Sequence, residues 1–102
     1  MKLKEVKTLV KDSRYVIIKI GASWCKPCKS EKFLGSYKKL KEQFKTKIKF
    51  VELDADSDQE ILEDSMFSVE SVPTIKLFKE GSLKKQYDGI DASEKILNYL
   101  SQ

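Results

Sequence analysis

The chain has 102 residues, of which 40% are hydrophobic, and this suits a single domain with a modest core that spans residues 1–102. The 20 basic and 16 acidic side chains leave a net charge of +4. Acids are interleaved with the lysines and no loop combines aromatic residues with a basic cluster, so we expect no nucleic-acid partner. There is also no run of about 18 apolar residues, so we expect no membrane span.

The first half of the chain alternates between helical and strand patterns. Apolar residues at helical spacing predict an amphipathic helix over roughly the first dozen residues. The run Tyr15–Ile20 is rich in β-branched residues and predicts a central strand that is buried on both faces. A second helical pattern runs to about Phe44 or Lys45, and Ile48–Leu53 predicts the next strand, which ends at Asp54.

Two sequence signals predict helix starts in the second half. Ser57 is followed three residues later by Glu60, and Asp91 is followed three residues later by Glu94. Both pairs match the capping-box pattern, in which the two side chains bind each other's backbone N–H groups. We therefore expect a short helix after Ser57 and the last helix after Asp91.

The remaining segments predict a loop and a hairpin. Residues 67–72 form the loop, Pro73 opens a strand over 74–78, residues 80–81 make a turn, and residues 83–87 pair with that strand. Strands connected by helices are expected to be parallel, and the final hairpin antiparallel. The sequence thus predicts an α/β fold with a central mixed four-stranded sheet and helices on both faces.

The segment Gly21–Lys29 contains both cysteines and the only tryptophan. It places Cys25 close to the first helical turn, where unpaired backbone N–H groups and the helix dipole favour an anion. Lys26 and Lys29 add positive charge, and a thiolate is the nucleophilic form of cysteine, so we expect the Cys25 thiol to ionise more readily than a free thiol. Cys28 is one helical turn further on, within reach of a disulfide with Cys25.

Three kinds of site could use this cysteine pair. Zinc usually takes four Cys or His ligands, but the chain has no histidine and no third cysteine, so we expect no metal. A structural disulfide across so short a loop would constrain the unfolded chain little. A redox pair in a reducing compartment fits best, and the N-terminal residues lack the apolar stretch of a signal peptide, so we expect a cytoplasmic protein.

The sequence Trp24–Cys28, placed after an apolar strand, resembles the active site of the thioredoxin family. Lys26 stands where that family usually has glycine. The resemblance extends over nearly the whole chain, because Ser71–Thr74 resembles the family's cis-proline loop, Phe78–Gly81 its hairpin turn, and Gly89 the glycine before its last helix. Thioredoxins usually begin with an extra strand, and the N-terminal segment is too short to hold both that strand and a full helix, so we expect it to be missing.

The resemblance implies a thiol–disulfide oxidoreductase of the protein-disulfide reductase type. Cys25 would be the nucleophile that forms a mixed disulfide with a protein substrate, and Cys28, expected to be the less exposed thiol, would resolve it. A thioredoxin reductase would supply the electrons, so the chain itself needs no cofactor, and we expect a monomer.

The same resemblance implies a substrate surface around the cysteines. A cis Val72–Pro73 bond would face them and present the Val72 backbone edge to an incoming peptide. Trp24, Lys26 and Pro27 would line the rest of that surface.

Lys19 and Glu52 depart from the family pattern. Lys19 stands where thioredoxins usually carry a buried Asp, and Glu52 stands where many carry Lys, so the two charges are exchanged. We predict a partly buried Lys19–Glu52 ion pair beneath the cysteines, with Glu52 as the base that takes the proton of Cys28 and Lys19 as its partner. The alternative is that one or both point to solvent at a strand end.

Two other functions remain open. A disulfide oxidase or isomerase would usually carry histidine at the place of Pro27 and would need an export signal. A non-catalytic adaptor would bind partners through the Pro73 loop, but it would not need two intact cysteines.

Overall fold

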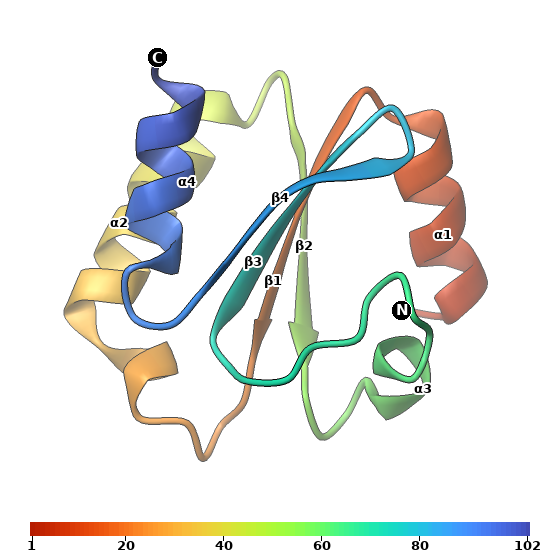
Figure 1. The fold of residues 1–102 in the computed structure, drawn as a ribbon, viewed down its shortest axis with the longest axis horizontal. Coiled ribbons are helices and arrows are strands. Elements are labelled where there is room, and N and C mark those ends of the chain that lie inside the picture. The colour runs from red at the N-terminus through yellow and green to blue at the C-terminus, as the bar shows by residue number, and fades with distance from the viewer.

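The computed structural model describes all residues, 1–102, as an α/β fold (Figure 1). In chain order its elements are α1 (Leu3–Asp12), β1 (Tyr15–Gly21), the 3-10 turn η1 (Pro27–Lys29), α2 (Glu31–Phe44), β2 (Lys49–Asp54), α3 (Gln59–Leu62), β3 (Thr74–Lys79), β4 (Ser82–Asp88) and α4 (Ala92–Leu100). No helix of the structure combines the length and the apolar composition that crossing a bilayer requires.

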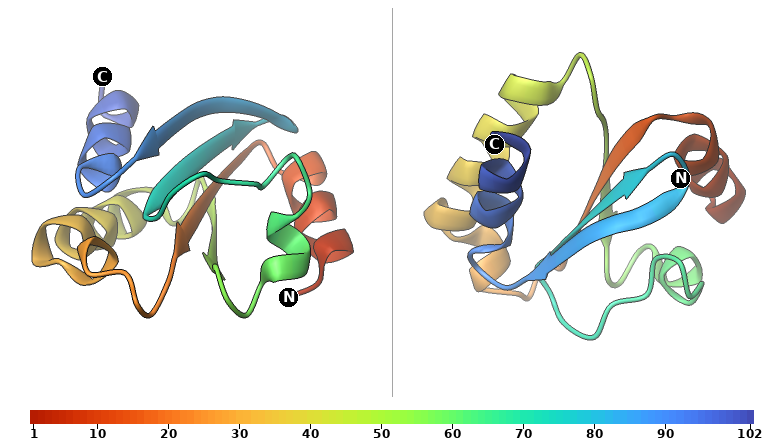
Figure 2. Two further views of the ribbon diagram at one scale, coloured as in Figure 1. Left: turned by 60° about the horizontal axis from the view of Figure 1, so that its bottom comes forward. Right: turned by 45° about the horizontal axis from the view of Figure 1, so that its top comes forward.

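The four strands form one mixed sheet in the order β2-β1-β3-β4. Helices α2 and α4 lie together on one face of this sheet, and α1 and α3 lie on the other (Figures 1 and 2). The mixed four-stranded sheet with helices on both faces is therefore confirmed, and the chain enters α1 without a preceding strand.

The direction of β3 differs from the expectation. Strands β1 and β2 are parallel as predicted, but β3 is antiparallel to β1, and β4 is antiparallel to β3. Helix α2 is long enough to carry the chain back along the sheet, so β2 starts at the same end as β1. Helix α3 has only 4 residues and stays near the end where β2 stops, so β3 starts at that end and runs back (Figure 1).

Strand β1 carries the core because its side chains alternate between the two faces of the sheet. Val16, Ile18 and Ile20 are fully buried on the side of α1 and α3, and Ile17 is fully buried on the side of α2 and α4. The predicted central, doubly buried strand is confirmed.

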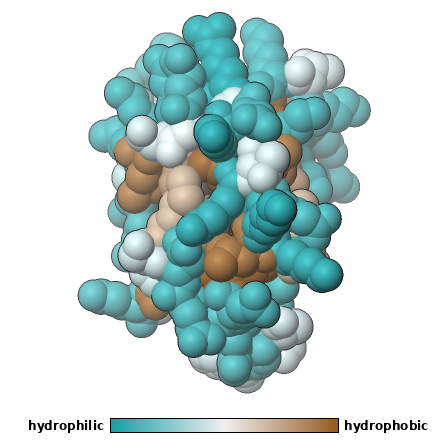
Figure 3. Space-filling view, turned by 90° about the vertical axis from the view of Figure 1, so that its right-hand side faces the viewer, coloured by the Kyte–Doolittle hydropathy of each residue, from teal (hydrophilic) through white to brown (hydrophobic).

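The face with α1 and α3 leaves apolar surface visible between charged side chains (Figure 3). Partly buried apolar side chains pack there against the core: Leu3, Leu9, Leu62, Met66, Val69 and Val72. Three of these six belong to the loop between α3 and β3, so this loop closes the core on that side.

Neither predicted capping box forms. Asp58, not Ser57, occupies the N-cap of α3, because the carboxylate of Asp54 at the end of β2 captures the backbone N–H and the hydroxyl of Ser57 at 3.0 and 3.1 Å. Asp91 does hold the N-cap position of α4, but its carboxylate forms an ion pair with Lys32 at 2.6 Å in place of a cap hydrogen bond. The expected helices form, but with other partners at their first turns.

Candidate active site

The chain turns from β1 into α2 in two steps. The loop after Gly21 leads into η1, and Ser30 then adopts an extended backbone and caps α2 by accepting a hydrogen bond from the Phe33 N–H at 3.2 Å. Cys25 therefore lies ahead of a short 3-10 turn and not at the first turn of α2 itself. The serine at position 30 separates the two helical segments.

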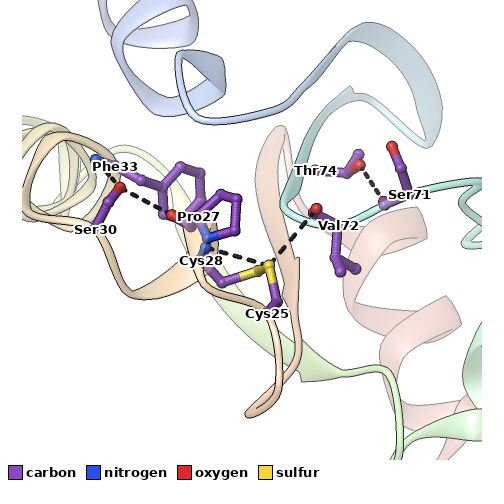
Figure 4. The surroundings of a disulfide bond; sticks show 8 residues. All are labelled: Cys25, Pro27, Cys28, Ser30, Phe33, Ser71, Val72 and Thr74. Atoms are coloured by element: carbon purple, nitrogen blue, oxygen red, sulfur yellow. Dashed lines mark hydrogen bonds between the residues drawn. A yellow bond between two sulfur atoms is a disulfide. The ribbon is translucent and has the colours of Figure 1, made fainter.

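Cys25 and Cys28 form a disulfide, with their Cα atoms 5.3 Å apart (Figure 4). The backbone N–H of Cys28 points at the Cys25 Sγ at 3.2 Å. This N–H is a donor that stabilises negative charge on that sulfur once the bond is reduced. The anion-stabilising contact therefore goes to Cys25, the residue that the sequence analysis predicts to be the nucleophile.

The prediction that Cys28 is less exposed than Cys25 is wrong for this oxidised state. Cys25 is 4% exposed and Cys28 is 9% exposed. The Val72 carbonyl oxygen lies 3.6 Å from the Cys25 Sγ and covers it from the side of the loop before β3. A cleft of about 370 Å³ opens on the other side and is lined by Cys28.

The Val72–Pro73 peptide bond is cis, as predicted. The Thr74 hydroxyl donates to the Ser71 carbonyl at 2.8 Å and fixes the turn before β3 (Figure 4). Pro73 is buried and Val72 is half-buried, so the backbone of Val72 faces the disulfide at the molecular surface.

The loop before η1 supplies an exposed rim on the other side of the disulfide. Trp24 is 66% exposed, and its indole N–H donates to the Asp56 carboxylate at 3.3 Å. Lys26 and Pro27 are also exposed. The structure therefore brings Trp24, Lys26 and Pro27 together beside the cysteines, opposite the Val72 edge.

Lys19 and Glu52 lie directly opposite each other on β1 and β2, and both line the cleft that reaches Cys28. The predicted ion pair between them is nevertheless wrong. The Glu52 carboxylate accepts hydrogen bonds from the Tyr37 hydroxyl at 2.6 Å and from the Lys41 ammonium at 3.2 Å. The Lys19 ammonium instead lies over the Tyr37 ring, 4.9 Å from its centroid.

The reason is the position of α2, which places Tyr37 where it contacts both charged side chains. Glu52 is also not buried, because its side chain is 44% exposed. Partial desolvation alone would raise the pKa of Glu52, but the hydrogen bonds from Tyr37 and Lys41 and the charges of Lys41 and Lys19 together hold this pKa below its usual value. Glu52 is therefore an ionised carboxylate at neutral pH.

Sequence reasoning missed two residues near the site. Tyr37 lies within the predicted second helix and was not expected to be a site residue, yet it binds Glu52, and burial together with Glu52 raises its own pKa well above normal. Lys76 was expected as an ordinary strand residue, yet it is 3% exposed. The available signal was a lysine flanked on both sides by apolar residues, Ile75 and Leu77, in a predicted strand.

Comparison with known proteins places this geometry in context. A family model described as Thioredoxin matches residues 2–102. The chain is 28% identical to a thioredoxin of Rickettsia felis over 87 residues, which cover 85% of this chain and 79% of that protein. It is 31% identical over 78 residues to thioredoxin 1 of Plasmodium falciparum, covering 76% of this chain and 70% of that protein. Among solved structures, oxidised mitochondrial thioredoxin 3 of Saccharomyces cerevisiae superposes with a TM-score of 0.82 and 26% identity over 97% of this chain and 88% of that one.

Proposed function

This chain belongs to the thioredoxin family, and from that premise we propose that it is a protein-disulfide reductase. It is a thiol–disulfide oxidoreductase with the Cys25–Cys28 pair as its redox centre. The observation that best supports reduction of protein substrates is the position of the Val72 backbone edge. The carbonyl oxygen of Val72 lies 3.6 Å from the Cys25 sulfur. An extended peptide that pairs with this edge carries its own disulfide to Cys25.

The reaction proceeds in two exchanges. The Cys25 thiolate attacks one sulfur of the substrate disulfide, forms a mixed disulfide, and expels the other substrate sulfur as a thiolate. The Cys28 thiolate then attacks the Cys25 sulfur, closes the Cys25–Cys28 disulfide, and releases the second substrate sulfur. The substrate gains two electrons and two protons, and the protein loses them.

The oxidised pair must be reduced again before the next cycle. The partner that we propose for this step is a thioredoxin reductase, because thioredoxins commonly take their electrons from such an enzyme. The chain contributes only the two thiols. We further propose that it works as one domain and as a monomer in the cytoplasm, where thiols are kept reduced.

The substrate surface consists of two sides that flank the disulfide. Val72 and Pro73 provide the pairing edge, and Trp24, Lys26 and Pro27 provide the exposed rim. The hydrogen bond from Trp24 to Asp56 fixes the indole, so its ring offers a rigid apolar contact to the substrate chain.

Glu52 is our proposed base for the second exchange. It lines the same cleft as Cys28, and this cleft leaves room for water between the carboxylate and the thiol. Tyr37 and Lys41 hold the carboxylate in place, and Lys19 contributes positive charge from across the strand pair. Because the pKa of Glu52 is lowered, Glu52 is present as the carboxylate but is a weak base, so its contribution is modest.

The other two functions fit the site less well. An oxidase or isomerase of the usual kind carries histidine where this chain has Pro27. A non-catalytic adaptor has no use for two cysteines that are already within bonding distance.

The proposed function is tested by the reduction of insulin with dithiothreitol. The wild-type protein should accelerate precipitation of the insulin B chain well above the rate with dithiothreitol alone. The reason is that the Val72 edge holds the insulin disulfide beside Cys25, whereas dithiothreitol must meet it by diffusion. A rate equal to that of dithiothreitol alone would contradict the proposal. Lys38→Gln, which removes an exposed charge on α2 outside the cleft of Cys28, should reduce insulin at the wild-type rate.

A further inference from the structure

Lys76 is the one charged side chain among the buried residues of this protein. It lies in the middle of β3, between Ile75 and Leu77, and is 3% exposed. None of the three ion pairs of the chain includes it. A buried ammonium without a paired acid carries a large desolvation cost, so its position calls for compensating hydrogen bonds.

The compensating contacts all come from one loop. The Lys76 ammonium donates to the Ser68 carbonyl oxygen at 2.7 Å and to the Met66 carbonyl oxygen at 3.3 Å. Burial lowers the pKa of Lys76, and the charge of Asp88 on the neighbouring strand partly counters this. A lysine suits this position because its ammonium has several donors and no acceptor, so one group binds two converging carbonyls.

This contact is part of a row along one face of β3. Side chains two residues apart share a face of a strand. On one face of β3, three such alternate side chains contact the loop that precedes this strand. Phe78 packs its ring against Phe67 with centroids 5.9 Å apart, Lys76 binds the loop carbonyls, and Thr74 donates to the Ser71 carbonyl at 2.8 Å. β3 therefore determines the path of the loop up to the residue before Val72.

The loop ends at the substrate edge. Val72 follows Ser71 directly, and its carbonyl oxygen lies 3.6 Å from the Cys25 sulfur. Between Phe67 and Ser71 the loop residues are exposed or half-buried, so apolar packing alone holds this stretch weakly. Lys76 is the donor from the sheet that reaches the middle of the loop.

We propose that Lys76 is a positioning residue for substrate binding: by holding the Met66 and Ser68 carbonyls it keeps the Val72 backbone edge beside Cys25, where a protein substrate pairs. This role rests on the proposed function. It predicts that loss of the ammonium weakens the binding of extended protein substrates and leaves the chemistry at Cys25 intact.

The test compares wild type with Lys76→Met, which keeps most of the length of the side chain and removes its donors. For insulin, KM should rise about tenfold, as expected for the loss of a hydrogen bond to a charged group, with little change in kcat. The rate constant for a small aromatic disulfide, dithiobis(nitrobenzoic acid), should stay within about twofold, because this substrate needs no strand pairing. Lys76→Arg, which keeps charge and donors, should restore most of the insulin KM.

Unchanged insulin KM in folded Lys76→Met would overturn the proposal, and so would an equal loss with both substrates, which is what a merely structural residue gives. If Lys76→Met does not fold, Lys76→Leu, which also lacks donors and charge, takes its place with the same criteria. Failure of the proposed function itself is distinguishable because it shows in the wild type, as absence of insulin reduction, and it overturns both proposals.

Discussion

Replacing Cys28 with serine should leave the protein covalently attached to its substrate. In Cys28→Ser the Cys25 thiolate still attacks the substrate disulfide, but no second thiol is present to resolve the mixed disulfide. Catalysed insulin reduction should fall to the background rate of dithiothreitol. When the reduced variant is mixed with its substrate without dithiothreitol, which would cleave the mixed disulfide, the adduct should appear on a non-reducing gel at the combined mass of protein and substrate and should disappear after reduction.

The matched variant is Cys25→Ser, which keeps one cysteine at the same site. It should be equally inactive but form no adduct, because Cys28 lacks the N–H contact that Cys25 receives at 3.2 Å. The comparison is decisive because Cys28 is the more exposed residue of the two, at 9% against 4%, and it lines the cleft. An adduct formed by Cys25→Ser and not by Cys28→Ser would reverse the two roles.

Glu52→Gln should slow the resolving step. We expect the single-turnover rate of disulfide reduction at pH 7 to fall roughly 10- to 100-fold, which is at or below the lower end of general-base catalysis. The low end is expected because the hydrogen bonds from Tyr37 and Lys41 lower the pKa of Glu52 and weaken it as a base. The deficit should shrink as the pH approaches ~8.5, the ordinary pKa of a thiol, where Cys28 ionises without help.

The measurement is the same reaction followed across pH for wild type, Glu52→Gln and the control Glu42→Gln. Glu42 is an exposed carboxylate on α2 that lies outside the cleft of Cys28, so its replacement makes the same change of charge without touching the site. Equal rates for wild type and Glu52→Gln at every pH would show that Glu52 and its hydrogen-bond partners Tyr37 and Lys41 have only a structural role. Solvent would then take the proton of Cys28.

The parts of the fold that the sequence predicted well carry strong local signals. β1 is a run of β-branched residues, the cysteine segment lies between a strand and a helix, and both were expected where the structure has them. The cis Val72–Pro73 bond was also expected, but through resemblance to a family and not through any local preference. The sheet has the predicted number of strands and no strand before α1.

The errors arose where a contact outside the predicted pattern overrides it. The direction of β3 depends on how far α3 carries the chain, and a capping signal does not encode that distance. Ser57 and Asp91 have the residue types of helix caps, but Asp54 and Lys32 bind them first. Asp54 belongs to the end of β2, and Lys32 belongs to α2.

The charged residues of the site show the same limit. Lys19 and Glu52 were correctly expected on neighbouring strands, where they are partners in register. Their separation depends on Tyr37, which reaches them from α2. The burial of Lys76 likewise follows from a loop that folds over β3, and only the three-dimensional structure reveals that loop's carbonyls.

The reduction potential of the Cys25–Cys28 couple tests the central claim most directly, because it separates a reductase from an oxidase or isomerase without reference to any one substrate. It is measured by equilibrating the protein with glutathione redox buffers and quantifying the oxidised fraction by thiol alkylation. A reductase of the thioredoxin type should have a potential of about −270 mV despite Lys26 between its cysteines. A value of about −180 mV or higher, in the range of disulfide isomerases and oxidases, would contradict the proposed function.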